Sequence, residues 1–114
     1  MNLMRDLKHI VETLNIPVET GVFSNKPPNE YVVITPMTDT FDLFADNKAQ
    51  LSVSEARLSL FTKGNYIKLK DTLTSTLLEH EITITGRQYV GFEEDTKYHH
   101  YAIDVMKAYE MGDE

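Results

Sequence analysis

The stretch YVVIT at residues 31–35 decides the fold, because it is an uninterrupted run of aromatic and β-branched residues that ends at Pro36. Such a run predicts a β-strand, and the lack of polar alternation predicts that both faces of the strand are buried. We therefore expect this segment to hold a central position in a sheet, with other parts of the chain packed on both of its faces.

Two segments on either side of this run have helical periodicity. In residues 2–15, apolar residues recur at spacings of three and four, Asn2 can cap the start, and Pro17 prevents continuation. Residues 65–80 repeat the pattern, with Asn65 as the cap. We expect both helices to pack their apolar stripes on the sheet. These stripes consist of Leu3, Leu7, Ile10, Val11 and Leu14 in the first helix and Tyr66, Leu69, Leu73 and Leu77 in the second. His80 continues the spacing at the C-terminal end of the second helix, where it can favour the helix dipole.

The remaining apolar segments predict further strands. Residues 18–23 are compatible with a short strand, and residues 51–62 with a longer one that needs a bulge near Ser54 and Glu55, because its apolar parity changes there. Two alternating segments, 82–92 and 98–105, predict a closing hairpin with a polar connection, and Gly86 is a candidate bulge.

The chain is predicted to form one α+β domain over residues 1–114. Its sheet is mainly antiparallel or mixed, with four to five strands and two helices packed on it. A chain of this length holds a single core and needs neither disulfides nor metal to fold, which suits the absence of cysteine.

Residues 37–50 follow neither period, and we expect a long loop there. Long loops in compact domains commonly serve function, so this segment is the first candidate for partner contact. The alternative is that its aromatic residues pack on the core or that it pairs as a short extra strand. The candidate contact residues combine apolar anchors with acids: Phe41, Asp42, Leu43, Phe44 and Asp46.

The tip of the closing hairpin is the second candidate surface, with Glu93, Glu94 and Tyr98 as its contact residues. Acidic charge is concentrated in this part of the chain, since seven acidic and two basic residues follow Tyr89. Such a run of acids is typical of a solvated turn, and the functional interpretation is that it binds a basic partner. Residues 110–114 have little to bury, and we expect them to fray.

The net charge of −7 argues against a protein whose main work is to grip nucleic acid, because that affinity comes from clustered Lys and Arg. Residues 1–14 contain neither a secretory segment nor a membrane span, so we expect a soluble protein that is made and assembled in a cytoplasm, with no membrane contact.

No set of residues predicts catalysis, a cofactor or a metal site. His99 and His100 are adjacent on a strand, so their imidazoles point to opposite faces and cannot easily share one ion. The aspartates between residues 39 and 46 lack the order of a calcium loop. No nucleophile elbow and no glycine-rich phosphate loop is present. We therefore expect a protein that is not an enzyme, with catalytic, metal and cofactor residues all absent.

The order of the elements, together with the strings EYVVI at 30–34, ARLSLF at 56–61 and YHHYAIDV at 98–105, resembles small tail-completion proteins of long-tailed bacteriophages. These are the tail-terminator, or head-to-tail joining, proteins. The similarity lies in element order and short strand strings and covers most of the chain.

The resemblance implies a structural virion protein, phage or prophage encoded, whose α+β subunits form a ring, six-membered in this family, on the end of the tail tube. The ring stops tube polymerisation and offers a surface to the head connector, while DNA passes through without specific binding. Its partners are copies of itself, the tail-tube protein and the connector protein. The resemblance also implies that the protein is located in the virion, is assembled in the host cytoplasm and has no catalytic residues.

Two other readings stay open on the sequence. One is a small cytoplasmic enzyme or ligand-binding domain whose site uses Tyr98, His99 and Tyr101. The other is a different phage component with a similar subunit, such as a connector or a tail-tube protein. A closed ring separates the tail-terminator reading from a tube protein, which polymerises without limit.

Overall fold

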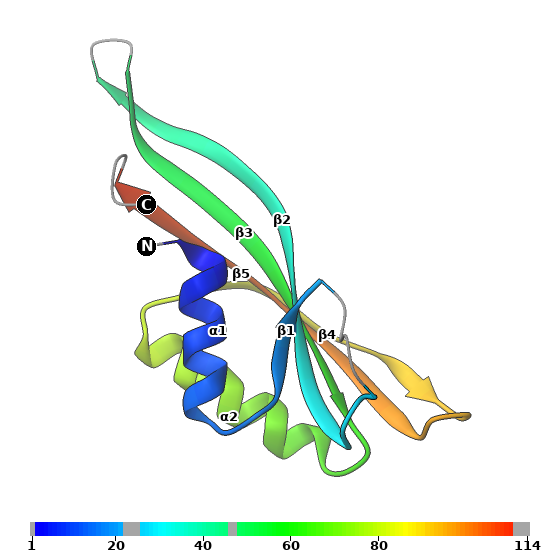
Figure 1. Cartoon of the computed structure of the whole chain (residues 1–114). Helices are drawn as coiled ribbons and strands as arrows, with labels where there is room; N and C mark the ends of the chain where they lie inside the picture. Colours follow the sequence, from blue (N-terminus) through cyan, green and yellow to red (C-terminus); the bar gives the residue numbers. More distant parts are fainter. Residues whose placement is uncertain (1, 22–25, 46–47, 111–114) are drawn as a thin grey trace.

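The computed structural model describes residues 2–21, 26–45 and 48–110, with the backbone alone described for 39–45 and 48–50. Within these ranges, two helices and five strands follow one another (Figure 1). The sheet has the order β1-β2-β3-β5-β4; β1 pairs with β2 in parallel, and all other neighbours are antiparallel. The expected α+β class, with a mixed sheet and two helices, is confirmed. The elements are α1 (Leu3–Thr13), β1 (Val18–Thr20), β2 (Glu30–Ala45), β3 (Lys48–Thr62), α2 (Tyr66–Glu79), β4 (Thr83–Glu93) and β5 (Tyr98–Glu110).

Both helices begin at the caps that the sequence predicts. The side chain of Asn2 accepts a hydrogen bond from the backbone N–H of Arg5 at 2.9 Å, and that of Asn65 accepts one from the N–H of Lys68 at 3.1 Å. Each bond satisfies one of the donors left unpaired at a helix start. The helix faces toward the sheet are fully apolar; the buried residues are Leu3, Leu7, Ile10 and Val11 in α1 and Leu69, Leu73 and Leu77 in α2.

The two helices cover the same face of the sheet (Figure 1). On that face the alternate residues of β2, β3 and β5 form the main core, which includes Val32, Ile34, Leu58, Leu60 and Ile103. The opposite face carries a smaller apolar cluster of Tyr31, Val33 and Tyr98, with Phe61 packed against it. This cluster is named the open-face cluster below.

The run at residues 31–34 is therefore buried on both faces, as predicted. This run belongs to β2, which has a neighbouring strand on both sides only at residues 32–34, where β1 pairs with it. The middle strand of the sheet is β3. The burial of Tyr31 and Val33 comes from aromatic side chains of β3 and β5 and not from a further layer of helices.

Residues 37–45 and 48–50 do not form the expected loop, and the alternative of strand pairing is correct for them. Strands β2 and β3 continue through these residues and are paired from Asp39 opposite Ser54 to Ala45 opposite Lys48, whereas residues 46–47 lie outside the described residues. The prediction was wrong because acidic and apolar residues are mixed on both parities of the segment, so no alternation marks it as a strand. Pairing with the next strand satisfies its backbone groups whatever its side chains are.

The predicted bulge lies on the other strand of this hairpin. Pro36 pairs with Ala56 and Asp39 with Ser54, so that Met37 and Thr38 together oppose Glu55. Strand β3 itself pairs with β5 without interruption from residue 51 to residue 62. The parity change in the sequence of β3 therefore predicts the position of the bulge along the sheet correctly, but the bulge is in β2 and not in β3.

Strand β4 is an edge strand with two irregularities. Its register with β5 shifts between Ile84 and Gly86 and again between Tyr89 and Gly91. The bulge predicted at Gly86 is confirmed, and the one before Gly91 was not foreseen. Bulges twist an edge away from regular pairing, which discourages the addition of another strand.

The sheet extends well beyond the helices, which gives the molecule an elongated shape of 55 × 25 × 23 Å. Figure 1 shows β2, β3 and β5 rising together past the start of α1. Strand β4 reaches only as far as Thr83 opposite Met106, and β1 only as far as Thr20 opposite Ile34. Among the described residues, this three-stranded extension thus has no strand paired to its outer edges. The tail beyond Glu110, where fraying is expected, lies outside the described residues.

Candidate functional site

The first predicted contact segment lies in the extension. Phe41, Asp42 and Phe44 pair through their backbones with Ser52, Leu51 and Ala49. Leu43 belongs to the same strand, whereas Asp46 lies outside the described residues. Residues 41–44 thus belong to a strand remote from the helices, and not to a loop that folds over the body.

The acidic turn, defined as Glu93, Glu94 and Asp95, connects β4 to β5. The hydroxyl of Thr96 donates to Glu93 Oε1 at 2.9 Å, and the N–H of Lys97 donates to the Glu93 carbonyl at 2.7 Å. All three acids are exposed. The turn is thus a tight, internally bonded structure that presents negative charge at one end of the sheet.

Tyr98, the third residue predicted at this tip, lies in the open-face cluster and is only 6% exposed. Its ring meets those of Tyr31 and Phe61 edge to face, at centroid distances of 5.5 and 6.2 Å. Its hydroxyl donates to the Pro28 carbonyl at 2.6 Å. The first residue of β5 points across the sheet and not outward along the turn, so Tyr98 belongs to the core of the subunit.

His99 and His100 point to opposite faces, as predicted from their adjacency. His99 lies on the helix side, where Nδ1 shares a 3.0 Å hydrogen bond with the Tyr89 hydroxyl and the ring lies 5.1 Å from that of Tyr66. His100 lies on the open face. Tyr98 shares that face, whereas Tyr101 lies on the helix side. Tyr98, His99 and Tyr101 therefore do not converge on one ligand site.

His100 stacks on Phe61 at a centroid distance of 4.3 Å. Its Nε2 is buried and has no hydrogen-bond partner among the described residues. Burial disfavours the charged imidazolium, which lowers the pKa of His100 below 6.5; nearby Glu93 opposes this shift and Arg57 adds to it. His100 is therefore a half-buried histidine whose neutral form the fold favours.

The centre of the open face carries an ion pair that the sequence did not reveal. Arg57 and Asp104 are directly opposite on β3 and β5, and the guanidinium makes two bonds to the carboxylate, at 2.7 and 3.0 Å. The hydrogen bond to Asp104 raises the pKa of Arg57, which stays charged. Because the Arg57 side chain is 44% exposed, this ion pair adds little to the free energy of unfolding, and its main effect is to fix the orientation of the two side chains.

An exposed apolar surface lies beside the acidic turn. We define the aromatic ridge as Tyr89, Val90 and Phe92 of β4, which are 42%, 48% and 45% exposed. The Phe92 ring lies 4.8 Å from that of His99, and Tyr89 lies 4.9 Å from Tyr66 of α2. In the sequence, Val90 and Phe92 share a parity with Ile82 and Ile84. The two bulges and the edge position of β4 leave them accessible, and Gly91 between them was the available signal.

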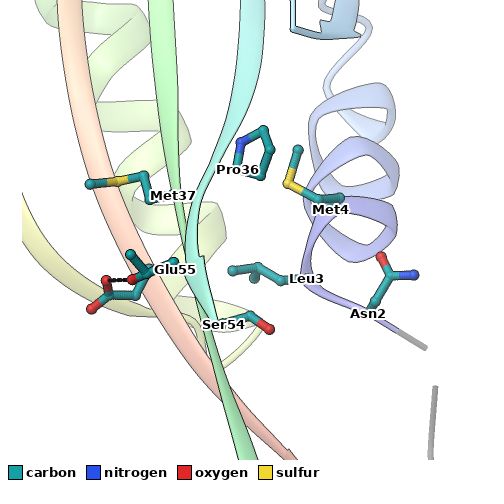
Figure 2. Close-up of a pocket in the computed structure, with 8 residues that line it drawn as sticks. Asn2, Leu3, Met4, Pro36, Met37, Ser54 and Glu55 are labelled. Atoms are coloured by element: carbon teal, nitrogen blue, oxygen red, sulfur yellow. Dashed lines mark hydrogen bonds between the residues drawn. The ribbon is translucent and has the colours of Figure 1, made fainter. Parts of the chain in front are cut away.

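A second apolar surface lies between the first turn of α1 and the bulge of β2. We define the methionine groove as a space of about 310 Å³ between these segments, lined by apolar and polar residues together: Asn2, Leu3, Met4, Pro36, Met37, Thr38, Ser54 and Glu55. Figure 2 shows Met4 of α1 and Pro36 of β2 facing each other, with Leu3 directed toward the strands. The Met37 side chain is 50% exposed and extends away from Met4, on the other side of β2 (Figure 2). The hydroxyl of Thr38 donates to the Glu55 carboxylate.

Within residues 2–21, 26–45 and 48–110, no three His, Asp or Glu side chains are grouped so that they could hold a metal ion. No helix in the described part of the chain has the length and apolar character needed to cross a membrane.

Comparison with known proteins gives no match, neither to any family model nor to any curated protein. The structure defines an elongated α+β fold with one helix-covered face, and its described surface carries exposed apolar side chains beside charged groups.

Proposed function

We propose that the chain is a structural virion assembly protein, a ring-forming tail terminator. In this role it caps the tail tube and joins it to the head connector. Its partners are copies of itself, the tail-tube protein and the connector protein. It acts in the virion after assembly in the host cytoplasm, without a catalytic step of its own.

The observation that supports this proposal most is the combination of an elongated α+β subunit with two different apolar surfaces. The aromatic ridge lies next to His99 at the start of β5, and the methionine groove lies at the level of Met106 near its end. A ring requires a heterologous interface, in which each subunit carries two different surfaces. The strand strings that resemble tail-completion proteins add to this support.

The charge of the chain is compatible with the same role. A ring on a tail tube has to let DNA pass, and a lumen that bound phosphates tightly would impede passage. With a net charge of −7, the subunit lacks the basic surplus from which tight binding to DNA arises.

Inactivation of the gene in a phage that carries it tests the proposal. Electron micrographs should then contain tail tubes of unregulated length and heads without tails, and supply of the wild-type protein from a plasmid should restore both length and joining. On intact tails the protein should form one closed ring at the tube end. Normal tails in the absence of the protein, or capped tubes that carry only single subunits, would contradict it.

The extension provides a second test through Phe44→Glu, with Leu78→Glu as the control. Leu78 is an exposed residue of α2, at 57%. We expect Phe44→Glu to weaken assembly while the subunit keeps its circular dichroism spectrum and its melting temperature, because the extension lies beyond the helices and the main core. If Phe44→Glu unfolds the subunit, the aromatic residues of the hairpin are core residues and not contact residues.

A further inference from the structure

The outer edges of the sheet differ between the body of the molecule and the three-stranded extension. In the body, β4 is interrupted by two bulges, and β1 is a strand of only 3 residues. Bulged and very short edge strands commonly protect a sheet against the addition of another strand. Among the described residues, the edges of the extension lack both forms of protection, so they are the part of this sheet that can accept a further strand.

The first of these edges belongs to β2. Beyond Pro36 and the bulge that follows it, β2 keeps one register with β3 from residue 39 to residue 45. This segment, named the β2 edge below, contains neither a proline nor a bulge. Strand β1 ends at Thr20, opposite Ile34, so no described strand lies on the outer side of the β2 edge.

The second edge consists of residues 107–110 of β5 and is named the β5 edge. Strand β4 begins at Thr83, opposite Met106, and leads away from this end of the sheet. Within the described part of the chain, the β5 edge therefore pairs with β3 alone. Figure 1 shows the extension with β2 on one side of β3 and β5 on the other.

The register shows which main-chain groups are free at the β5 edge. The N–H of Val32 bonds at 2.9 Å to the segment that enters β1, so Val32 turns its main-chain groups away from β3. Leu60 is opposite Val32 and therefore turns its groups toward β5, and so does Ser54, because these directions alternate along a strand. Lys107, opposite Ser54, turns its groups toward β3. The N–H and C=O of the next residue, Ala108, thus point to the free edge.

The two edges lie at the same level of the sheet and run in the same direction. Asp39 and Lys107 both pair with Ser54 of β3, and β2 and β5 are each antiparallel to β3. Because β3 lies between them, the edges of one subunit are about 10 Å apart, at about 4.8 Å between neighbouring strands, and they cannot pair with each other. Each edge can therefore gain a partner of the other kind only from another molecule.

A second copy of the chain supplies the matching strand. Rotation about an axis along the strands brings the β2 edge of one copy beside the β5 edge of the next, with both strands parallel. Each copy keeps one edge of each kind for a further neighbour, which is the heterologous arrangement that closes a ring. The edges carry Asp39, Asp42 and Glu110 beside one base, Lys107, so the contact rests on main-chain groups and not on charge.

From these observations we propose that the β2 edge of one copy of this chain pairs in parallel with the β5 edge of a second copy. Residues on neighbouring strands share a face, so Lys107 of one copy lies beside Asp39 or Phe41 of the other. The extensions of successive copies then join into one continuous sheet around the ring. The inference rests on the proposed function and identifies its subunit contact.

Disulfide trapping tests the pairing, since the chain has no cysteine of its own. Lys107→Cys is mixed with Asp39→Cys and, separately, with Phe41→Cys. One of the two mixtures should give a disulfide-linked dimer on mild oxidation, because neighbouring strands bring Cα atoms within the roughly 7 Å that a disulfide spans. Lys107→Cys mixed with Leu78→Cys, which lies at an exposed position of α2, is the control and should give no such dimer.

The two cysteines of the productive mixture, placed together in one chain, extend the test. Within one subunit they are two strands apart, about 10 Å or more, which is too far for an internal disulfide. Oxidation should therefore produce a ladder of covalent oligomers that ends at the size of the ring.

Ala108→Pro removes the N–H that the β5 edge offers, and Ala108→Val is the matched control that keeps it. The bonds from β5 to β3 come from the residues on either side, so proline is tolerated at this edge position. In sedimentation velocity, Ala108→Pro should associate at least about tenfold more weakly than the wild type, because an acceptor on the neighbouring copy loses its partner. Ala108→Val should associate like the wild type, and melting curves should show that both variants are folded.

A wild-type protein that stays monomeric at raised concentration, or the absence of a cross-link in both mixtures, would overturn the inference. Normal association of Ala108→Pro would overturn it as well, and so would efficient cross-linking of Asp39→Cys to itself, which would indicate pairing between two β2 edges. Rings that form without these edges would overturn it and leave the tail-terminator role intact. Conversely, a covalent ladder from a protein that does not act on tail tubes would refute the proposed function and keep the contact.

Discussion

Replacement of Tyr98 by alanine tests whether the open-face cluster is part of the folded core. The tyrosine is 6% exposed and packs against Tyr31 and Phe61. The Lys63 ammonium lies 4.9 Å from the centre of its ring. Its hydroxyl donates a hydrogen bond to the Pro28 carbonyl, and this bond connects the segment before β2 to the open face of the sheet.

The size of the effect follows from these contacts. Truncation of a buried aromatic side chain to alanine costs about 3–5 kcal/mol of unfolding free energy, because transfer free energy is lost and a cavity remains. Tyr98→Phe keeps the ring and removes the hydroxyl alone, which costs about 1 kcal/mol for the hydrogen bond to Pro28. The alanine variant thus loses several times as much as the phenylalanine variant.

Urea denaturation followed by circular dichroism measures both losses. A loss of about 4 kcal/mol lowers the unfolding midpoint by about 2 M if the slope is about 2 kcal/mol per molar urea. Tyr89→Ala is the matched control, since Tyr89 is 42% exposed and should lose less. If Tyr98→Ala unfolds at nearly the wild-type midpoint, Tyr98 does not pack in the core and the interpretation as an exposed contact residue is correct.

Three further predictions concern stability. His100→Phe should flatten the pH dependence of the urea midpoint, because burial lowers the pKa of His100 in the folded protein. Below about pH 6.5 the imidazole takes up a proton more readily in the unfolded chain, so the wild-type protein loses stability as the pH falls. Above that pH His100 is neutral in both states and contributes no pH dependence. An unchanged slope between pH 7.5 and 5.5 would contradict the burial of this imidazole. Leu73→Ala, at a fully buried position of α2, should cost about 2–5 kcal/mol in a denaturant titration, and Leu78→Ala on the exposed side far less. Asn65→Ala should cost about 1 kcal/mol by removing the cap of α2, which Asn65→Ser should largely retain.

The local sequence pattern was enough to predict the structure of a segment wherever a single apolar periodicity dominated that segment. Both helices and both caps were predicted because apolar spacing and a capping side chain are properties of neighbouring residues. The opposite faces of His99 and His100 followed in the same way from strand geometry. The closing hairpin was also predicted, with its turn placed between Glu93 and Lys97.

The errors share one physical cause, which is that strand pairing involves residues distant in sequence. Residues 37–45 form a strand because residues 48–54 lie opposite, although their own side chains do not alternate. The bulge falls at Met37 and Thr38 because β3 is held in register by β5 on its other side. Tyr98 was assigned to the surface because its partner, the segment at Pro28, is 70 residues away.

By itself the sequence determined the class of this protein: an acidic α+β chain with two amphipathic helices and a strand that is buried at residues 31–34. These features depend on side-chain periodicity, which local sequence contains in full. Only the tertiary structure decided what the surface offers. The exposure of Tyr89, Val90 and Phe92, and the groove between the start of α1 and the bulge of β2, arise from bulges and from the order of the strands in the sheet. Both depend on hydrogen bonds between strands that no single segment encodes.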